Sequence, residues 1–250
     1  MSEVKQYYIG WDVGAWYCDE NSKSRDAIVI LDSESNVIGI PCRKNIADEI
    51  LSTINALGFV KELFRLCKCL EKFYEKDKFL IAIDTPLGYS EGFVKLVTNK
   101  GFSDFKKGDE IGNPYLFRET ERRIAKEFKK SLSAVTHMIG SQSTKGMHAL
   151  AKFANNELER TGVWKAKEGE IFFIETYPAV QEKINMANLD AVLSEKIPAI
   201  GISKRLDIVD AYKCAVIAYE FDNDKEREIF HQPEKDIPIA EGWIWAKKKN

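Results

Sequence analysis

Short apolar segments separated by polar turns make up the first 41 residues of the chain. This alternation predicts strands at 7–13, 26–31 and 36–41, with the turn-forming residues 32–35 joining the second strand to the third. Connections as short as these favour an antiparallel meander.

The periodicity then changes. Between residues 46 and 76 the apolar positions recur every three or four residues, which predicts an amphipathic helical segment with a break near Gly58. Residues 79–83 are continuously apolar, as in a strand buried on both faces, and Asp84-Thr85-Pro86 ends this strand. Because the chain reaches this strand through a long helical connection, we expect it to run parallel to the first strand, which then lies centrally in the sheet.

The stretch from about 86 to 165 is richer in polar, glycine and lysine residues and has helical patterns at 114–130 and 146–160. We interpret it as a helical insertion that faces the substrate. An apolar run at 171–174, a helix at 203–221 and an edge or docked segment at 243–245 complete the pattern. These elements predict a single α/β domain over residues 1–250.

The composition is that of an ordinary globular protein, with 44% hydrophobic and 30% charged residues. The five cysteines include no Cys-x-x-Cys pair, so neither a disulfide framework nor a zinc site is predicted. The sequence has no apolar run of membrane-spanning length and does not open like a signal peptide, so we expect a cytoplasmic protein without a membrane partner. The net charge of −2 gives no overall attraction to nucleic acid.

Candidate chemistry begins with three acids, Asp12, Asp84 and Glu175, each at or just past the carboxyl end of an apolar strand. In open α/β sheets, ligands bind at that edge. Any one of these acids could instead be a local cap for backbone N–H groups.

The final predicted helix adds Asp210. It shares a helical stripe with four apolar residues, and an unpaired carboxylate there must be protonated, paired with a base or bound to metal. Asp207 could join the same site or serve as an acid in the first turn of the helix. The stripe consists of Leu206, Asp210, Cys214, Ile217 and Phe221.

The order of these acids along the chain fits a two-metal centre for phosphoryl transfer. Mg²⁺ and Mn²⁺ prefer carboxylate oxygens, and two such ions need several carboxylates to offset their charge. We therefore expect Mg²⁺ or Mn²⁺ as the cofactor.

Five segments resemble the successive sequence blocks of a prokaryotic family of predicted nucleases with an RNase H-like fold, and the similarity spans nearly the whole chain. The resemblance implies a five-stranded sheet in the order 3-2-1-4-5, a metal site at Asp12, Asp84 and Asp210, and roles for Glu175 and Arg118. The segments are Gly10-Trp11-Asp12-Val13-Gly14, Ile83-Asp84-Thr85-Pro86-Leu87-Gly88, Phe117-Arg118-Glu119-Thr120-Glu121-Arg122, Ile174-Glu175-Thr176-Tyr177-Pro178 and Asp207-Ile208-Val209-Asp210-Ala211-Tyr212.

Arg118 and Arg122 lie four residues apart on one predicted helical face, where they could clamp a substrate phosphate. If so, the Arg118 guanidinium should point into the cleft that holds the acids. The alternative is a solvated helix in which Glu119, Glu121 and Glu127 pair with the bases. Residues 141–146, which include Lys145, form a weaker candidate for a phosphate cradle.

The leading hypothesis is metal-dependent phosphodiester hydrolysis of a nucleic acid or nucleotide, as in a nuclease. One alternative is an actin-like or sugar-kinase-like phosphotransferase, since Asp12-Val13-Gly14 also resembles the phosphate loop of those folds, although no second glycine-rich loop follows residue 150. The other is a non-catalytic module that binds a nucleotide.

Overall fold

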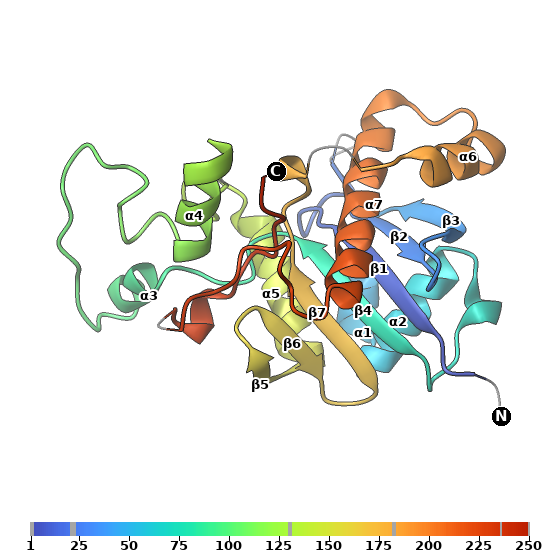
Figure 1. The fold of residues 1–250 in the computed structure, drawn as a ribbon, viewed down its shortest axis with the longest axis horizontal. Coiled ribbons are helices and arrows are strands. Elements are labelled where there is room, and N and C mark those ends of the chain that lie inside the picture. Colours follow the sequence, from blue (N-terminus) through green and yellow to red (C-terminus); the bar gives the residue numbers. More distant parts are fainter. Residues whose placement is uncertain (1–2, 21–23, 130–131, 182–183, 236, 250) are drawn as a thin grey trace.

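A mixed open sheet forms the centre of the protein, with helices on both of its faces (Figure 1). The structure is a computed structural model that describes residues 3–20, 24–129, 132–181, 184–235 and 237–249. In this part of the chain the sheet has seven strands in the order β3-β2-β1-β4-β7-β6-β5. Their bounds are Gln6–Asp12 (β1), Ala27–Leu31 (β2), Val37–Arg43 (β3), Lys78–Asp84 (β4), Ala154–Arg160 (β5), Val163–Ala166 (β6) and Glu170–Glu175 (β7).

Strand β1 lies inside the sheet and not at its edge, as predicted. It pairs antiparallel with β2 on one side and parallel with β4 on the other. Strand β7 follows β4, again in parallel, so β3-β2-β1-β4-β7 has the order expected for the first five strands. The predicted strand number was wrong, because β6 and β5 extend the sheet beyond β7 by antiparallel pairing.

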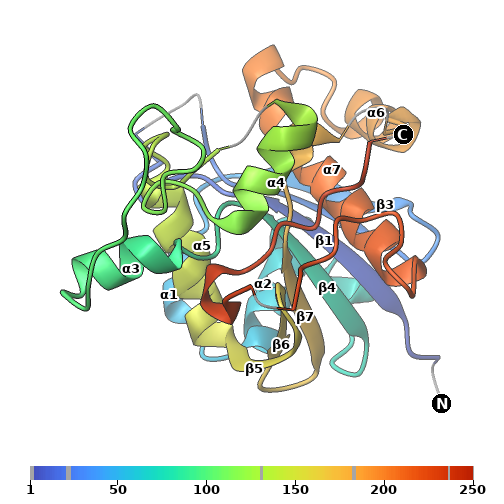
Figure 2. The same cartoon turned by 60° about the vertical axis from the view of Figure 1, so that its left-hand side comes forward.

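Two layers of helices cover the sheet (Figures 1 and 2). Helices α1, α2 and α5 lie over one face, and α7 crosses the other with α6 beside it. Alternate residues of β1 divide between the two cores: Tyr7 and Ile9 face the first layer, and Tyr8 faces α7. The helices are α1 (Ala47–Ser52), α2 (Ala56–Leu66), α3 (Glu91–Val97), α4 (Glu119–Phe128), α5 (Gly140–Phe153), α6 (Ala187–Lys196) and α7 (Ile202–Asn223), with short 3₁₀ turns at Leu70–Lys72, Pro178–Val180 and Ile239–Glu241.

Gly10 lets α7 approach β1 closely. A Cβ atom at this position would lie 1.8 Å from the carbonyl oxygen of Ala211, a distance that no side chain can adopt. Ala211 directly follows Asp210, so the missing side chain in the middle of β1 brings this part of the helix down onto the sheet, next to the end of β1 at Asp12.

Residues 86–165 differ from their predicted structure. The first predicted helix, 114–130, is shorter as α4, and its last position lies outside the described residues. The second, 146–160, begins earlier as α5 and ends at Phe153, where Ala154 turns to extended backbone and β5 pairs with β6. Pairing with a neighbouring strand overrides the local helical preference of 154–160. Helix α3 was not predicted, and α5 packs into the main core through Ala149 and Leu150.

The C-terminal segment is docked rather than a regular strand. Trp243 and Trp245 are fully buried, and the backbone N–H of Trp245 donates to the carbonyl of Glu175 at the end of β7. Figure 2 shows this segment running along the body of the protein beside α4. In the part of the chain that the structure describes, every helix is too short or too polar to cross a membrane.

Candidate functional site

Asp12 and Asp84 end two neighbouring parallel strands and lie opposite each other in the register of the sheet. Both side chains line one cavity, which encloses about 180 Å³ and lies at the carboxyl ends of β1, β4 and β7. Within the described residues, neither carboxylate takes part in a hydrogen bond or ion pair. The parallel pairing therefore places two partner-free acids side by side at the edge of the sheet, where ligands bind in such folds.

The electrostatics of this pair are unfavourable for two negative charges. Burial raises the pKa of Asp12 well above its usual range, and the charge of Asp84 raises it further. Burial likewise raises the pKa of Asp84, with added contributions from Asp210 and Glu175, while Lys213 opposes the shift. A cation bound between these groups would relieve the repulsion.

Asp210 reaches the same neighbourhood from α7. Its charge acts on both Asp12 and Asp84, but its carboxylate pairs with Lys213 at 3.0 Å and its side chain is 39% exposed. The helical stripe predicted to face the sheet does so only in part. Its first residue, Leu206, lies one turn before Asp210 and is 57% exposed. Lys213 itself was not anticipated, although it stands three residues after Asp210, at ion-pair spacing on a helix.

Asp207 has its own partners one turn earlier on α7. Its Oδ2 atom accepts a hydrogen bond from Arg43 Nε at 2.7 Å and from the backbone N–H of Arg25 at 3.3 Å. These contacts tie α7 to the end of β3 and to the segment before β2. Asp207 is still close enough to Asp12 to raise the pKa of that carboxyl.

Glu175 lines the cavity from the end of β7, and both of its carboxylate oxygens are engaged. Arg118 donates to Oε1 at 2.5 Å and to Oε2 at 2.9 Å, and the backbone N–H of Leu87 donates to Oε2 at 3.0 Å. Glu175 therefore fixes the loop after β4, which carries Thr85, against the end of β7.

Arg118 is itself enclosed, with only 2% of its surface exposed. Besides Glu175 it donates to Glu121 Oε1 at 2.9 Å and to the carbonyl oxygen of Glu241 at 2.8 Å. Burial would lower the pKa of Arg118, but the charges of Glu121 and Glu175 outweigh it and raise that pKa. The Arg118 guanidinium thus points toward Glu175, one of the acids at the cavity, and its role as a phosphate clamp stays a prediction.

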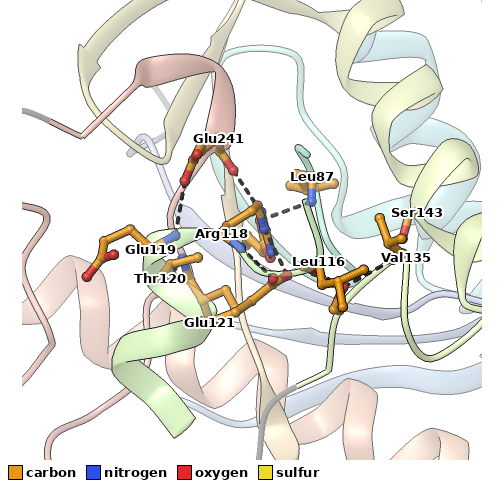
Figure 3. Close-up of polar contacts among 12 residues, drawn as sticks. Leu87, Leu116, Arg118, Glu119, Thr120, Glu121, Val135, Ser143 and Glu241 are labelled. Carbon is orange, nitrogen blue, oxygen red and sulfur yellow. Dashed lines mark hydrogen bonds and ion pairs between the residues drawn. The ribbon is translucent and has the colours of Figure 1, made fainter. Parts of the chain in front are cut away.

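Glu241 completes this network from the C-terminal segment. Its side chain accepts from the backbone N–H of Glu119, the first residue of α4, at 3.0 Å (Figure 3). It also accepts from the backbone N–H of Glu91, the first residue of α3, at 2.8 Å. One carboxylate thereby caps two helices. Arg122, the other predicted substrate-binding arginine, donates to the carbonyl oxygens of Ile111 and Asn113 and does not line the cavity.

A second buried network, not anticipated from the sequence, lies behind the Asp12 loop. The ammonium of Lys145 contacts Asp26 Oδ2 at 2.5 Å and Asn45 Oδ1 at 2.9 Å, and both charged side chains are fully buried. Asp26 also accepts from Trp11 Nε1 and from the backbone N–H of Gly14, each at 2.9 Å. Because the ammonium of Lys145 is paired with the Asp26 carboxylate, it does not serve as the cation of the phosphate cradle considered for residues 141–146.

The sequence carried little signal for these partners. Asp26 stands just before an apolar strand and Lys145 lies within a polar stretch, positions that are common for exposed charges. Their separation of 119 residues hides the pairing from any local pattern.

Several uncharged residues complete the cavity. Thr85 is 5% exposed, and its hydroxyl has no hydrogen-bond partner in the described part of the chain. The described lining residues include no lysine or arginine; apart from the three acids and Thr85 they are Val13, Ser24, Pro86, Leu132, Ile139, Gln142, Thr176, Tyr177 and Ile244.

The predicted metal centre is not assembled as a group of three ligands in this structure. Across the residues described, no three His, Cys, Asp or Glu side chains are grouped closely enough to hold a metal ion. Asp12, Asp84 and Asp210 are close enough for their charges to interact, and a metal site at these residues stays a prediction.

Comparisons with known proteins leave the family open. Searches with models of protein families, with curated proteins and with solved structures found no match to this chain.

Proposed function

We propose that the protein is a Mg²⁺- or Mn²⁺-dependent phosphodiesterase of the nuclease type, with Asp12 and Asp84 as the principal metal ligands. The observation that carries the proposal is the pairing of these two acids on adjacent parallel strands. Both face one cavity without any hydrogen-bond or ion-pair partner in the described chain. Both residues are half-buried, and carboxylates withdrawn from water without a partner are costly unless they are protonated or bound to a cation.

The donor set fits the proposed cation. Mg²⁺ is held in proteins by one or two carboxylates, together with water and substrate phosphate oxygens, and Mn²⁺ accepts similar oxygen ligands. Asp12 and Asp84 would supply the two carboxylates, and Asp210 would join them if it left Lys213. Asp207 remains a further candidate, although one of its oxygens is paired with Arg43. The bound cation would supply Lewis-acid polarisation of a phosphoryl group.

The remaining residues have supporting roles in this proposal. Glu175 has both oxygens occupied by Arg118 and Leu87, so we assign it a positioning role rather than that of a general base. The Arg118 network links β7, α4 and the C-terminal segment around the cavity. This keeps the cavity walls fixed relative to Asp84.

We further propose that the fold is RNase H-like. The support is the antiparallel meander β1-β2-β3 followed by the parallel strands β4 and β7, with a late helix packed on β1. This arrangement matches the sheet order and the helix-borne acid that the sequence resemblance implies. Fold alone does not establish a reaction, so the activity rests on the carboxylate pair.

The test is hydrolysis of bis(p-nitrophenyl) phosphate with Mn²⁺ or Mg²⁺, alongside Mn²⁺ titration by calorimetry. We expect activity that EDTA abolishes, and Asp84→Asn should lose both activity and Mn²⁺ binding. Asp104→Asn, which changes an exposed acid outside the cavity, is the charge-matched control and should behave like the parent. Undiminished Mn²⁺ binding by Asp84→Asn would refute the metal site, and nucleotide binding without hydrolysis would favour a non-catalytic module.

A further inference from the structure

The walls of the cavity indicate what kind of substrate it accepts. Its volume of about 180 Å³ is below the roughly 300–1,000 Å³ of common ligand pockets. The lining is largely apolar, with Leu132 and Ile139 from the segment leading into α5, Tyr177 after β7 and Ile244 from the C-terminal segment. A cavity of this size has room for a single ring-sized group beside the carboxylates rather than for several.

The charges that line the cavity also favour a small substrate. Proteins that bind nucleic-acid chains neutralise several phosphates with lysine and arginine. The cavity is lined by three acids, no basic residue lines it within the described chain, and the whole protein carries a net charge of −2. A cation held by Asp12 and Asp84 would attract a single phosphate, and the described lining offers no lysine or arginine for the further phosphates of a chain.

Two residues are placed to recognise the rest of a small substrate. Tyr177 is half-buried and lines the cavity, where its aromatic ring can stack on a base. Thr85 presents a buried hydroxyl that no described group of the protein satisfies. Buried polar groups are rarely left without a partner, so this hydroxyl indicates a polar atom of a ligand.

From this combination we infer that the site takes one nucleotide unit at a time, with the phosphodiester at the carboxylates and the base against Tyr177 and the apolar wall. The unit can come from a free small nucleotide ester or from the end of a strand. The inference rests on the proposed function, since it specifies the substrate class of the same site.

The activity test compares three substrates in Mn²⁺: the p-nitrophenyl ester of thymidine 5′-monophosphate, a linear single strand and a covalently closed circular single strand. We expect cleavage of the ester, and the linear strand reports whether strand ends are also accepted. The circle should remain uncut. For the strand, log affinity should change with log salt by a slope of about −0.7, the value for one neutralised phosphate. Cleavage of the circle as fast as the linear strand would overturn the inference and leave the phosphodiesterase activity standing.

Binding of thymidine 5′-monophosphate, measured by calorimetry with Ca²⁺, tests the inference even without hydrolysis. Tyr177→Ala should weaken binding roughly 5- to 150-fold, as for loss of a base stack, while Tyr74→Ala, an exposed tyrosine elsewhere, should not. Thr85→Val should weaken binding roughly 2- to 10-fold, the value of one hydrogen bond. The thermal stability of the protein should not fall, because the Thr85 hydroxyl has no hydrogen-bond partner in the described chain. Absence of nucleotide binding by the parent, or unchanged binding in both cavity variants, would refute the assignment.

Discussion

Replacing Lys145 by methionine removes the cationic partner of a fully buried carboxylate while keeping most of the side-chain volume. In the parent, Lys145 contacts Asp26 and Asn45 from inside α5, and none of the three side chains is more than 9% exposed. Leaving one partner of a buried ion pair uncompensated costs about 3–5 kcal/mol. For a chain of this size, that corresponds to a fall of roughly 6–20 °C in Tm.

The loss of stability in the variant should depend on pH through the protonation of Asp26. Burial raises the pKa of Asp26, and Lys145 opposes that shift, so the variant should have a still higher Asp26 pKa. A carboxyl whose pKa is higher in the folded than in the unfolded state stabilises the fold below its unfolded pKa, and this contribution is lost as the pH rises through the folded value. The variant should therefore lose most stability at neutral pH and less near pH ~5, where Asp26 takes up a proton more easily.

Urea denaturation at both pH values measures this, with Lys152→Met as the matched control on the same helix. Lys152 donates to the carbonyl oxygens of Ile50 and Leu51 and faces no carboxylate in the contacts described, so its loss should cost no more than about 1–2 kcal/mol. Adding Asp26→Asn to Lys145→Met should recover part of the stability. A loss below about 1 kcal/mol, or equal losses at both pH values, would show that the pair is not the constraint inferred from its burial.

Four further outcomes are expected. Asp210→Asn should weaken Mn²⁺ binding in calorimetry, yet unfold in EDTA at no lower temperature than the parent. The relief of repulsion at Asp12 and Asp84 should offset the loss of the half-exposed ion pair with Lys213, which is worth about 0–1 kcal/mol. Lys213→Met should tighten Mn²⁺ binding, since a competing cation next to Asp210 is lost; weaker binding would contradict this. Gly10→Ala should cost at least about 1–3 kcal/mol in urea denaturation, because its Cβ would collide with Ala211, and equal stability would contradict the close packing. In EDTA, the parent should lose stability as the pH rises from about 4 toward neutrality, because burial raises the pKa of Asp84, and Asp84→Asn should flatten this profile.

Much of the fold and part of the site could be predicted from the sequence. Alternating and continuous apolar runs encode which faces of a segment are buried, and this defined the meander and the central position of β1. The long helical connection to 79–83 implied a parallel strand, and parallel pairing brings the strand ends together. That Asp12 and Asp84 lie next to each other could therefore be predicted from the parallel pairing of their strands.

The tertiary structure decided which charged groups pair and how segments of mixed preference fold. Arg118 bonds to Glu175, 57 residues away, and Lys145 to Asp26, because the packing of α4 and α5 against the sheet brings these groups together. Likewise residues 154–160 form β5 only because β6 offers a strand to pair with. Local periodicity reports burial within a segment, whereas the partner of a buried charge is fixed by contacts between segments that are distant in the chain.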